Sequence, residues 1–263
     1  TLRTGLAQLL KLHPKKSPIA ITSFGATYNL EREQVMQING LFQTPIAEYV
    51  LEGDTEELDN GLTKFILGIE EAEKIENNPQ FSVAGVDGYQ TKGDLLQRKN
   101  PFMEELAKRM SGFLAQYYAA ITNGGELPPN SLLNSWGNIY RKGTTSVVHT
   151  HPEANMAVTY YPRVPKDLQH PNNRTDAVVK NLTLPLIPDG SFVVNDPRPC
   201  ARYDSAFAHN SSIGLPPIQG GGFIIPGWLE HFVVPHYTDD LRICISTNVL
   251  VPKGLGTQGG NLE

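Results

Sequence analysis

The sequence has little cysteine, no long apolar run and no excess of positive charge. Two of its 263 residues are cysteine, Cys200 and Cys244, too few for a disulfide framework or a cysteine-rich zinc site. No apolar run approaches the ~20 residues that a membrane-spanning helix needs. The net charge of −5 argues against nucleic-acid binding through charge. The N-terminal residues lack the order of a signal peptide, so we expect a soluble, cytoplasmic protein.

Helical patterns occupy the first half of the chain. Residues 1–12 place leucines on one face and predict a short helix. Residues 41–53 follow a turn and predict extended structure. Residues 54–78 combine an apolar stripe with acidic ends, which predicts an amphipathic helix with a solvated face. Residues 101–122 predict a second helix, because apolar residues recur at helical spacing between a proline and a glycine pair.

The second half of the chain has a different character. From residue 131 onward, short β-branched and aromatic runs are separated by clusters of proline, glycine, asparagine and aspartate. Many short strands at such spacing predict an antiparallel sandwich or barrel. We expect the helical half to pack against this barrel as one unit, with loops at residues 165–177 and 197–220 on its rim.

Two histidines lie near the end of one predicted strand. Side chains alternate along a strand, so Val147, His149 and His151 are expected on the same side. Two imidazoles at this spacing can converge on one metal ion. Imidazole suits iron, zinc, copper or nickel, and Fe(II) oxygenase sites commonly use two histidines and one carboxylate. Two pairs satisfy this geometry, either His149 with His151 or His151 with Glu153.

The last predicted strands add a third histidine and an arginine. His231 opens a strand that follows a Pro-Gly turn. Arg242 and Cys244 lie on the polar face of the final strand, opposite isoleucines. A guanidinium aimed into a barrel interior is costly unless it meets an anion. The partner of Arg242 is therefore either a protein carboxylate or the carboxylate of a ligand.

Other conspicuous side chains are expected to be structural. Trp228 is predicted to pack under the turn that leads to His231. Residues 196–198 predict a structural turn, with the aspartate capping and the arginine paired. Four further histidines fall in predicted loops, where we expect solvated side chains: His13, His170, His209 and His236.

The motifs together resemble the 2-oxoglutarate/Fe(II)-dependent dioxygenases, and more narrowly a group of such oxygenases found in bacteria and phages. The resemblance covers about residues 40–250. The matching residues are Ser135-Trp136, Asn138 and Gly143, His149-Thr150-His151-Pro152, Tyr160-Tyr161, Asp196-Pro197-Arg198, Pro226, Trp228-Leu229 and His231, and Arg242-Ile243, Ile245-Ser246 and Asn248.

This resemblance implies a role for several residues. His231 takes the place of the distal iron ligand, and Arg242 that of the partner of the 2-oxoglutarate C5 carboxylate. Asn138 and one tyrosine of the 160–161 pair are implied to add hydrogen bonds to this co-substrate. Strand parity turns one of the two tyrosines inward, and we favour Tyr161.

Two positions depart from the wider superfamily. His151 stands where an aspartate or glutamate is usual, so the metal site is either three-histidine or takes its carboxylate from Glu153. We expect His149, His151 and His231 as the ligands. Cys244 stands two residues after Arg242, where the superfamily usually has the serine of an Arg-x-Ser pair. This difference implies looser binding of the co-substrate.

The resemblance implies a fold, a domain organisation and an activity. The fold is mainly β with flanking helices, a double-stranded β-helix (jelly-roll, cupin-like) barrel. A single oxygenase-like domain at 40–252, with helical support at 54–122 and the barrel at 131–252, lies between an N-terminal extension (1–39) and a tail (253–263). The activity is that of a 2-oxoglutarate- and Fe(II)-dependent dioxygenase, an oxidoreductase that hydroxylates an unidentified substrate with release of succinate and CO2.

Two other classes use the same barrel. One is a cupin-like metal-binding protein, and the other is a non-catalytic accessory protein. Both fit the His-x-His pattern, whereas Arg242, eleven residues after His231, favours the oxygenase. The substrate is expected to be a small molecule or a protein side chain, with no nucleic-acid or membrane partner. The sequence leaves the oligomeric state open.

Overall fold

The computed structural model describes residues 27–30, 34–37, 43–75, 88–168, 187–198 and 211–252. The chain divides into two compact units, Thr1–Thr44 and Pro45–Glu263. In the first unit, the described residues form an antiparallel pair of strands, β1 (Thr27–Leu30) and β2 (Gln34–Gln37). The helix predicted at residues 1–12 and the tail at 253–263 lie outside the described residues. The domain boundaries drawn from the sequence stay predictions.

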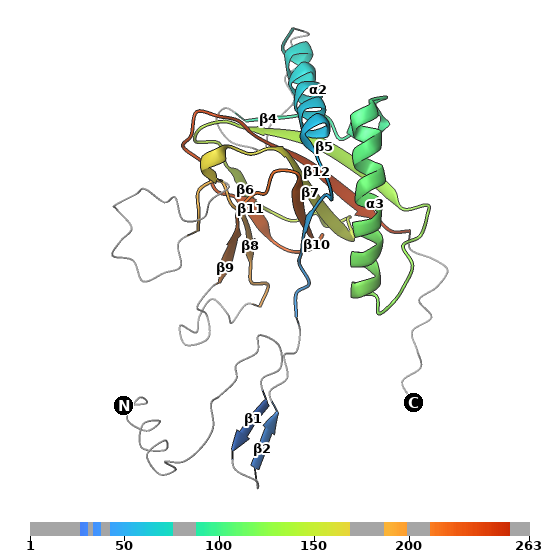
Figure 1. Ribbon diagram of the computed structural model, residues 1–263, viewed down its shortest axis with the longest axis vertical. Helices are drawn as coiled ribbons and strands as arrows, with labels where there is room; N and C mark the ends of the chain where they lie inside the picture. The colour runs from blue at the N-terminus through green and yellow to red at the C-terminus, as the bar shows by residue number, and fades with distance from the viewer. Residues whose placement is uncertain are drawn as a thin grey trace. The chain divides into compact units, whose positions relative to one another are not determined.

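The second unit is built on two antiparallel sheets (Figure 1). The larger sheet has the order β3 (Ala47–Val50), β10 (Gly221–Pro226), β7 (Met156–Arg163), β12 (Arg242–Leu250), β5 (Leu132–Tyr140) and β4 (Tyr89–Gln90). The smaller sheet has the order β6 (Ser146–His149), β11 (His231–Val233), β8 (Phe192–Asn195) and β9 (Ser212–Leu215). From β5 to β12 the chain alternates between the two sheets, except at the neighbouring pair β8 and β9, as in a double-stranded β-helix. The predicted fold class is confirmed.

Two long helices follow the sequence signals closely. α2 spans Glu56–Ile75 and carries three acidic residues in its first turn, where they favour the positive end of the helix dipole. α3 spans Pro101–Ile121, and the Asn100 side chain caps it by accepting hydrogen bonds from the backbone N–H groups of Phe102 (3.0 Å) and Met103 (3.2 Å). Two short 3-10 helices, η1 (Leu95–Gln97) and η2 (Lys166–Leu168), complete the described helices. No described helix is long and apolar enough to cross a bilayer.

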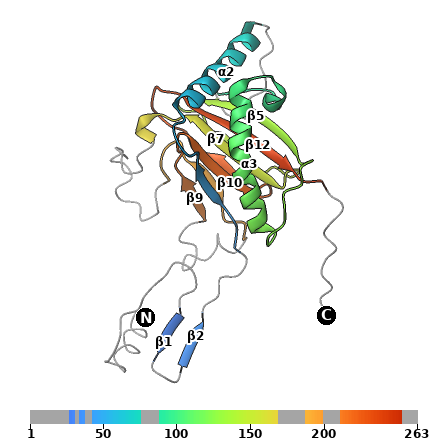
Figure 2. The ribbon, with the colours of Figure 1, turned by 45° about the vertical axis from the view of Figure 1, so that its right-hand side comes forward.

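Two apolar clusters fill the unit, one on each face of the larger sheet. α2 and α3 cover the outer face (Figure 2), and Leu62, Met103 and Ile245 are among the fully buried side chains of this cluster. The other cluster lies between the two sheets and includes Tyr161 and Phe223. Alternation along β12 therefore turns its isoleucines toward the helices and its even-numbered residues toward the barrel interior.

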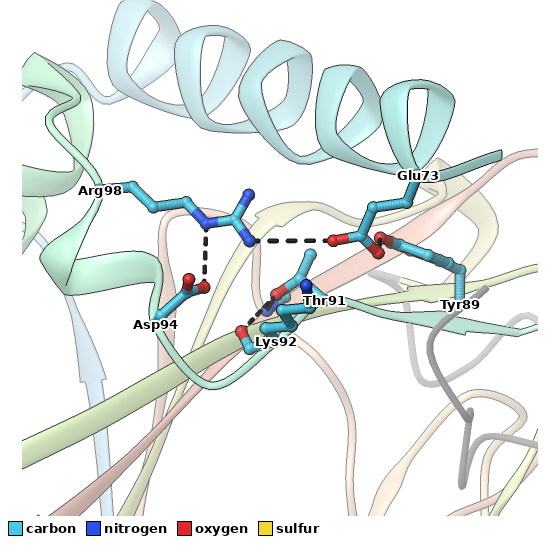
Figure 3. A network of polar contacts seen from close by, with 7 residues as sticks. Glu73, Tyr89, Thr91, Lys92, Asp94 and Arg98 are labelled. Atoms are coloured by element: carbon cyan, nitrogen blue, oxygen red, sulfur yellow. Dashed lines mark hydrogen bonds and ion pairs between the residues drawn. The ribbon is translucent and has the colours of Figure 1, made fainter. Parts of the chain in front are cut away.

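A polar network ties α2 to the edge of the larger sheet (Figure 3). The Tyr89 hydroxyl of β4 donates to the buried carboxylate of Glu73, which also lies 3.8 Å from Arg98 Nη2. Arg98 Nε in turn donates to Asp94 Oδ1 at 2.9 Å. β4 pairs with β5, so this network anchors the helix to the strand that carries Asn138.

Candidate metal centre

Three histidines from two strands and a loop converge in the described structure. The ligand atoms of His149, His151 and His231 all lie within 4.8 Å of one another. His149 ends β6 and His231 begins β11, and the two are direct partners across these strands. His151 follows β6, where its backbone N–H donates to the carbonyl of Gly227 at 2.7 Å. A tight turn of the chain at Gly227 thus holds the third ring beside the other two.

A β-bulge in β6 changes which side chains face inward. His231 pairs with His149, but Val233 pairs with Ser146, so β6 carries one extra residue in this stretch. Ser146 and His149 both line the interior cavity, whereas the Val147 side chain is 58% exposed. The expectation that Val147 shares a side with the histidines is therefore wrong, because the bulge shifts the alternation.

Hydrogen bonds to the backbone set the orientation of two rings. Nδ1 of His231 lies 2.8 Å from the carbonyl oxygen of Leu229, and Nδ1 of His149 lies 2.7 Å from that of Val147. A carbonyl accepts only, so each Nδ1 carries the hydrogen and leaves the Nε2 lone pair free in the neutral ring. Metal-ligating histidines are usually oriented this way by their second nitrogen.

Burial keeps two of the rings neutral. Desolvation, aided by the neighbouring His149, lowers the pKa of His231 to about 3 and that of His151 to about 4. Both rings therefore offer lone pairs at neutral pH, the form that binds a metal ion. The group fits a borderline metal such as Fe(II), for which imidazole is a suitable ligand.

Other predicted residues lie elsewhere. Glu153 is exposed and is not part of the histidine group among the described residues. Trp228 is 54% exposed, so its predicted packing under the turn is wrong, and Leu229 is the residue buried there. The turn at residues 196–198 is confirmed, with Arg198 Nη2 at 2.6 Å from Asp196 Oδ2.

His236 is buried rather than solvated, which corrects the prediction. Its side chain is 1% exposed, and its Nε2–H donates to the carbonyl of Tyr140 at 3.2 Å, while Nδ1 accepts from Thr238 Oγ1 at 3.2 Å. The loop that carries His236 folds back onto the end of β5, an arrangement that local sequence does not encode. His13, His170 and His209 lie outside the described residues.

An interior cavity of about 280 Å³ connects the histidines with the other predicted residues. Side chains from both sheets form its walls, and most of the lining is apolar or aromatic, including Phe192, Phe223 and Ile225. All seven residues expected at the site line this one cavity: His149, His151, His231, Arg242, Tyr161, Asn138 and Cys244.

Arg242 is a buried cation with free donors. Its side chain is 1% exposed, and its guanidinium carbon lies 4.6 Å and 4.9 Å from the ring centroids of Tyr140 and Tyr161. Nη2 donates to the Tyr161 hydroxyl at 3.4 Å, but Nε and Nη1 have no hydrogen-bond partner in the described part of the chain. Among the described residues no carboxylate pairs with it. An anionic ligand would satisfy these buried donors, which otherwise carry the full cost of desolvation.

The tyrosine pair on β7 is divided between the two faces of the sheet. Tyr161 lines the cavity, whereas the Tyr160 hydroxyl points toward α2 and donates to Asp59 at 2.6 Å. Asn138 Nδ2 donates to Ser246 Oγ at 3.1 Å on the cavity wall. Burial raises the pKa of the neighbouring Cys244 thiol, which is therefore protonated at neutral pH.

No role in the site was predicted from the sequence for three of the wall residues. Tyr140 stacks on Arg242, Ser146 lines the cavity beside it, and the Trp136 ring lies 5.7 Å from that of His151. The alternation of side chains along β5 could have identified two of them. Trp136 and Tyr140 each lie two residues from Asn138 and therefore share its face of the strand.

The register of β5 and β12 orders the cavity from end to end. Arg242 pairs with Tyr140, Cys244 with Asn138, and Ser246 with Trp136. Trp136 contacts His151, so the histidine group and Arg242 lie at opposite ends of this series. Such a cavity suits an elongated ligand with a carboxylate at one end and metal-binding oxygens at the other.

Part of the chain matches a known protein family. Residues 134–248 match the model of a family described as "Putative 2OG-Fe(II) oxygenase". The matched stretch runs from β5 to β12 and contains the three histidines and Arg242. No curated protein sequence matches the chain.

A solved structure shares the fold. The chain is similar to the non-heme alpha ketoglutarate dependent epimerase SnoN from nogalamycin biosynthesis, with a TM-score of 0.51, 12% identity, and 79% of this chain and 78% of that chain covered. It is also similar to a prolyl-4-hydroxylase of Pseudomonas putida (TM-score 0.49, 11% identity, 81% and 95% covered). A third is AviO1 of Streptomyces viridochromogenes (TM-score 0.49, 13% identity, 81% and 92% covered).

Proposed function

Because residues 134–248 match the model of a 2OG-Fe(II) oxygenase family, we propose that this chain decarboxylates 2-oxoglutarate with O2 at an Fe(II) ion held by His149, His151 and His231. One observation carries the proposal. The three histidine ligand atoms within 4.8 Å of one another share a cavity with a buried arginine, two of whose nitrogens have no hydrogen-bond partner among the residues that the structure describes. Enzymes of this family use Fe(II) and 2-oxoglutarate.

The residues fit both groups. Neutral imidazoles whose Nδ1 atoms are engaged by the backbone suit a divalent metal. The Nε and Nη1 donors of Arg242 suit the C5 carboxylate of 2-oxoglutarate, and Tyr140 and Tyr161 hold the guanidinium plane between their rings. We assign Tyr161, Asn138 and Cys244 to the wall beside the co-substrate.

The metal, when bound, supplies the oxygen chemistry that yields succinate, CO2 and an oxidant for the substrate C–H bond. The protein positions the co-substrate and excludes water from the site. Arg242 fixes the far end of the co-substrate, which sets the distance of its oxo acid end from the histidines. The apolar wall of Phe192, Phe223 and Ile225 excludes water from the cavity. A small molecule or a protein side chain as substrate, and a cytoplasmic location, are proposed from the sequence.

The test is succinate release by the purified full chain supplied with Fe(II), 2-oxoglutarate and O2. We expect substrate-independent succinate formation in the wild type. His231→Ala abolishes it, whereas Glu153→Gln, which removes an exposed carboxylate, leaves it unchanged. A chain that binds Fe(II) but never consumes 2-oxoglutarate would contradict the proposal and favour the cupin-like metal-binding alternative.

A further inference from the structure

The charge on the walls of the cavity bears on what else it binds. The histidine group offers three imidazoles, and imidazole binds a metal ion in its neutral form. The common arrangement of two histidines and one carboxylate would instead place a negative charge on the metal. Glu153, two residues after His151, and Glu230, next to His231, are both exposed and lie outside the group in the described part of the chain.

The other charged group of the cavity is also positive. Arg242 is a cation, and no aspartate, glutamate or lysine is among the described residues that line the cavity. A divalent metal ion and Arg242 together bring three positive charges, of which the 2-oxoglutarate dianion neutralises two. The excess positive charge lies at the histidine end, because the C5 carboxylate meets Arg242 at the other end. An uncompensated charge in a largely apolar cavity is costly.

We propose that the metal-loaded cavity takes up one monovalent anion in addition to 2-oxoglutarate, beside the three histidines. This rests on the proposed function, because it requires the bound metal. The carboxylate of a substrate or a small inorganic anion would provide the same chemistry, a single negative charge on a compact donor. We expect this anion binding because residue 151 is a histidine. A carboxylate at this position would itself supply the negative charge.

Anion binding is tested with Co(II) in place of iron, since its visible absorption reports changes in the ligands. The Co(II)- and 2-oxoglutarate-loaded full chain is titrated with sodium azide and, separately, with sodium acetate. His151→Asp and His151→Asn form a matched pair of nearly equal shape that differs in charge. We expect the wild type and His151→Asn to bind the anion at least ten times more tightly than His151→Asp. A response to acetate but not azide would identify the substrate carboxylate as the source, and a response to azide identifies a small inorganic anion.

Two controls keep the result clear. Acetamide, the neutral analogue of acetate, is expected to leave the Co(II) spectrum of the wild type unchanged, a measurement that needs no variant. Glu153→Gln is expected to bind the anion as the wild type does. Equal anion affinity of the Asp and Asn variants, no response of the wild type to either anion, or a tenfold gain in Glu153→Gln would overturn the inference. Failure of the proposed function is seen separately, as absence of a spectral response to Co(II) or to 2-oxoglutarate before any anion is added.

Discussion

The Nε2 atoms of His151 and His231 lie 3.1 Å apart, although the two residues are 80 positions apart in the sequence. Nδ1 of His231 donates to the carbonyl of Leu229, so the Nε2 lone pair of His231 points at the facing ring. Nε2 of His151 either donates its hydrogen to this lone pair or presents a second lone pair, which repels the first unless a cation lies between them. The geometry therefore suits metal binding, and it makes the site sensitive to acid.

The stability of the metal-free protein is expected to depend on the protonation of this pair. The pKa of His231 in the fold, about 3, and that of His151, about 4, lie below the ordinary value of 6.5. Between these values the unfolded chain binds more protons, so the free energy of unfolding decreases as pH falls below about 6.5. The decrease in melting temperature from pH 7 to pH 4.5 should be larger for the wild type than for His231→Gln. If the melting temperatures of the two proteins change equally with pH, burial of the His231 ring does not make the fold sensitive to acid.

Arg242→Gln is expected to weaken 2-oxoglutarate binding by about 3 kcal/mol, roughly 100-fold, because it removes the cation that meets the C5 carboxylate. The metal-free protein should lose little stability, since Nε and Nη1 of Arg242 have no hydrogen-bond partners within the described ranges. Calorimetric titration of the metal-loaded chain measures the affinity. Arg163→Gln, which removes a half-exposed arginine paired with Asp240, is the matched control and should bind normally. Equal losses in both variants would contradict the assignment of Arg242.

The two adjacent tyrosines are expected to separate stability from binding. Tyr160→Phe removes the hydrogen bond to the buried Asp59 and should cost about 2 kcal/mol of unfolding free energy without changing 2-oxoglutarate affinity. Tyr161→Phe should lower that affinity and leave stability closer to the wild type, because its hydroxyl faces the cavity. Denaturant unfolding and co-substrate titration of both variants provide the comparison. A reversed pattern would mean that Tyr160 is the inward residue.

Asn100→Ala is expected to destabilise the fold by about 1 kcal/mol, because the Asn100 side chain accepts two N–H hydrogen bonds at the start of α3. Helix α3 covers the outer face of the larger sheet, away from the cavity, so metal and 2-oxoglutarate binding should be unchanged in the folded protein. Urea unfolding measures the first quantity. No loss of stability would mean that the cap contributes little in this helix.

Features with a local signal could be predicted from the sequence. The bounds of α3 follow from Pro101, the glycine pair after the helix and the spacing of apolar residues, and the His-x-His spacing marks two of the three clustered histidines. The alternation of side chains along β12 was sufficient to predict that Arg242 and Cys244 face away from the isoleucines.

Features that depend on contacts between distant strands were missed or predicted wrongly. The bulge that exposes Val147 appears only when β6 is paired with β11. The burial of His236 depends on the Tyr140 carbonyl, 96 positions away. The position of Tyr140 over Arg242 likewise follows from the pairing of β5 with β12, which brings the two residues opposite each other.

The central claim is that the histidine group and Arg242 are two ends of one co-substrate site. The most direct measurement is anaerobic equilibrium binding of 2-oxoglutarate to the full chain with and without Fe(II). One molecule per chain is expected to bind, at least tenfold more tightly with the metal, and both the Arg242→Gln and His231→Ala variants should lose this tight binding. If the metal-loaded wild type binds no 2-oxoglutarate, or binds it equally well without Fe(II), the account is contradicted.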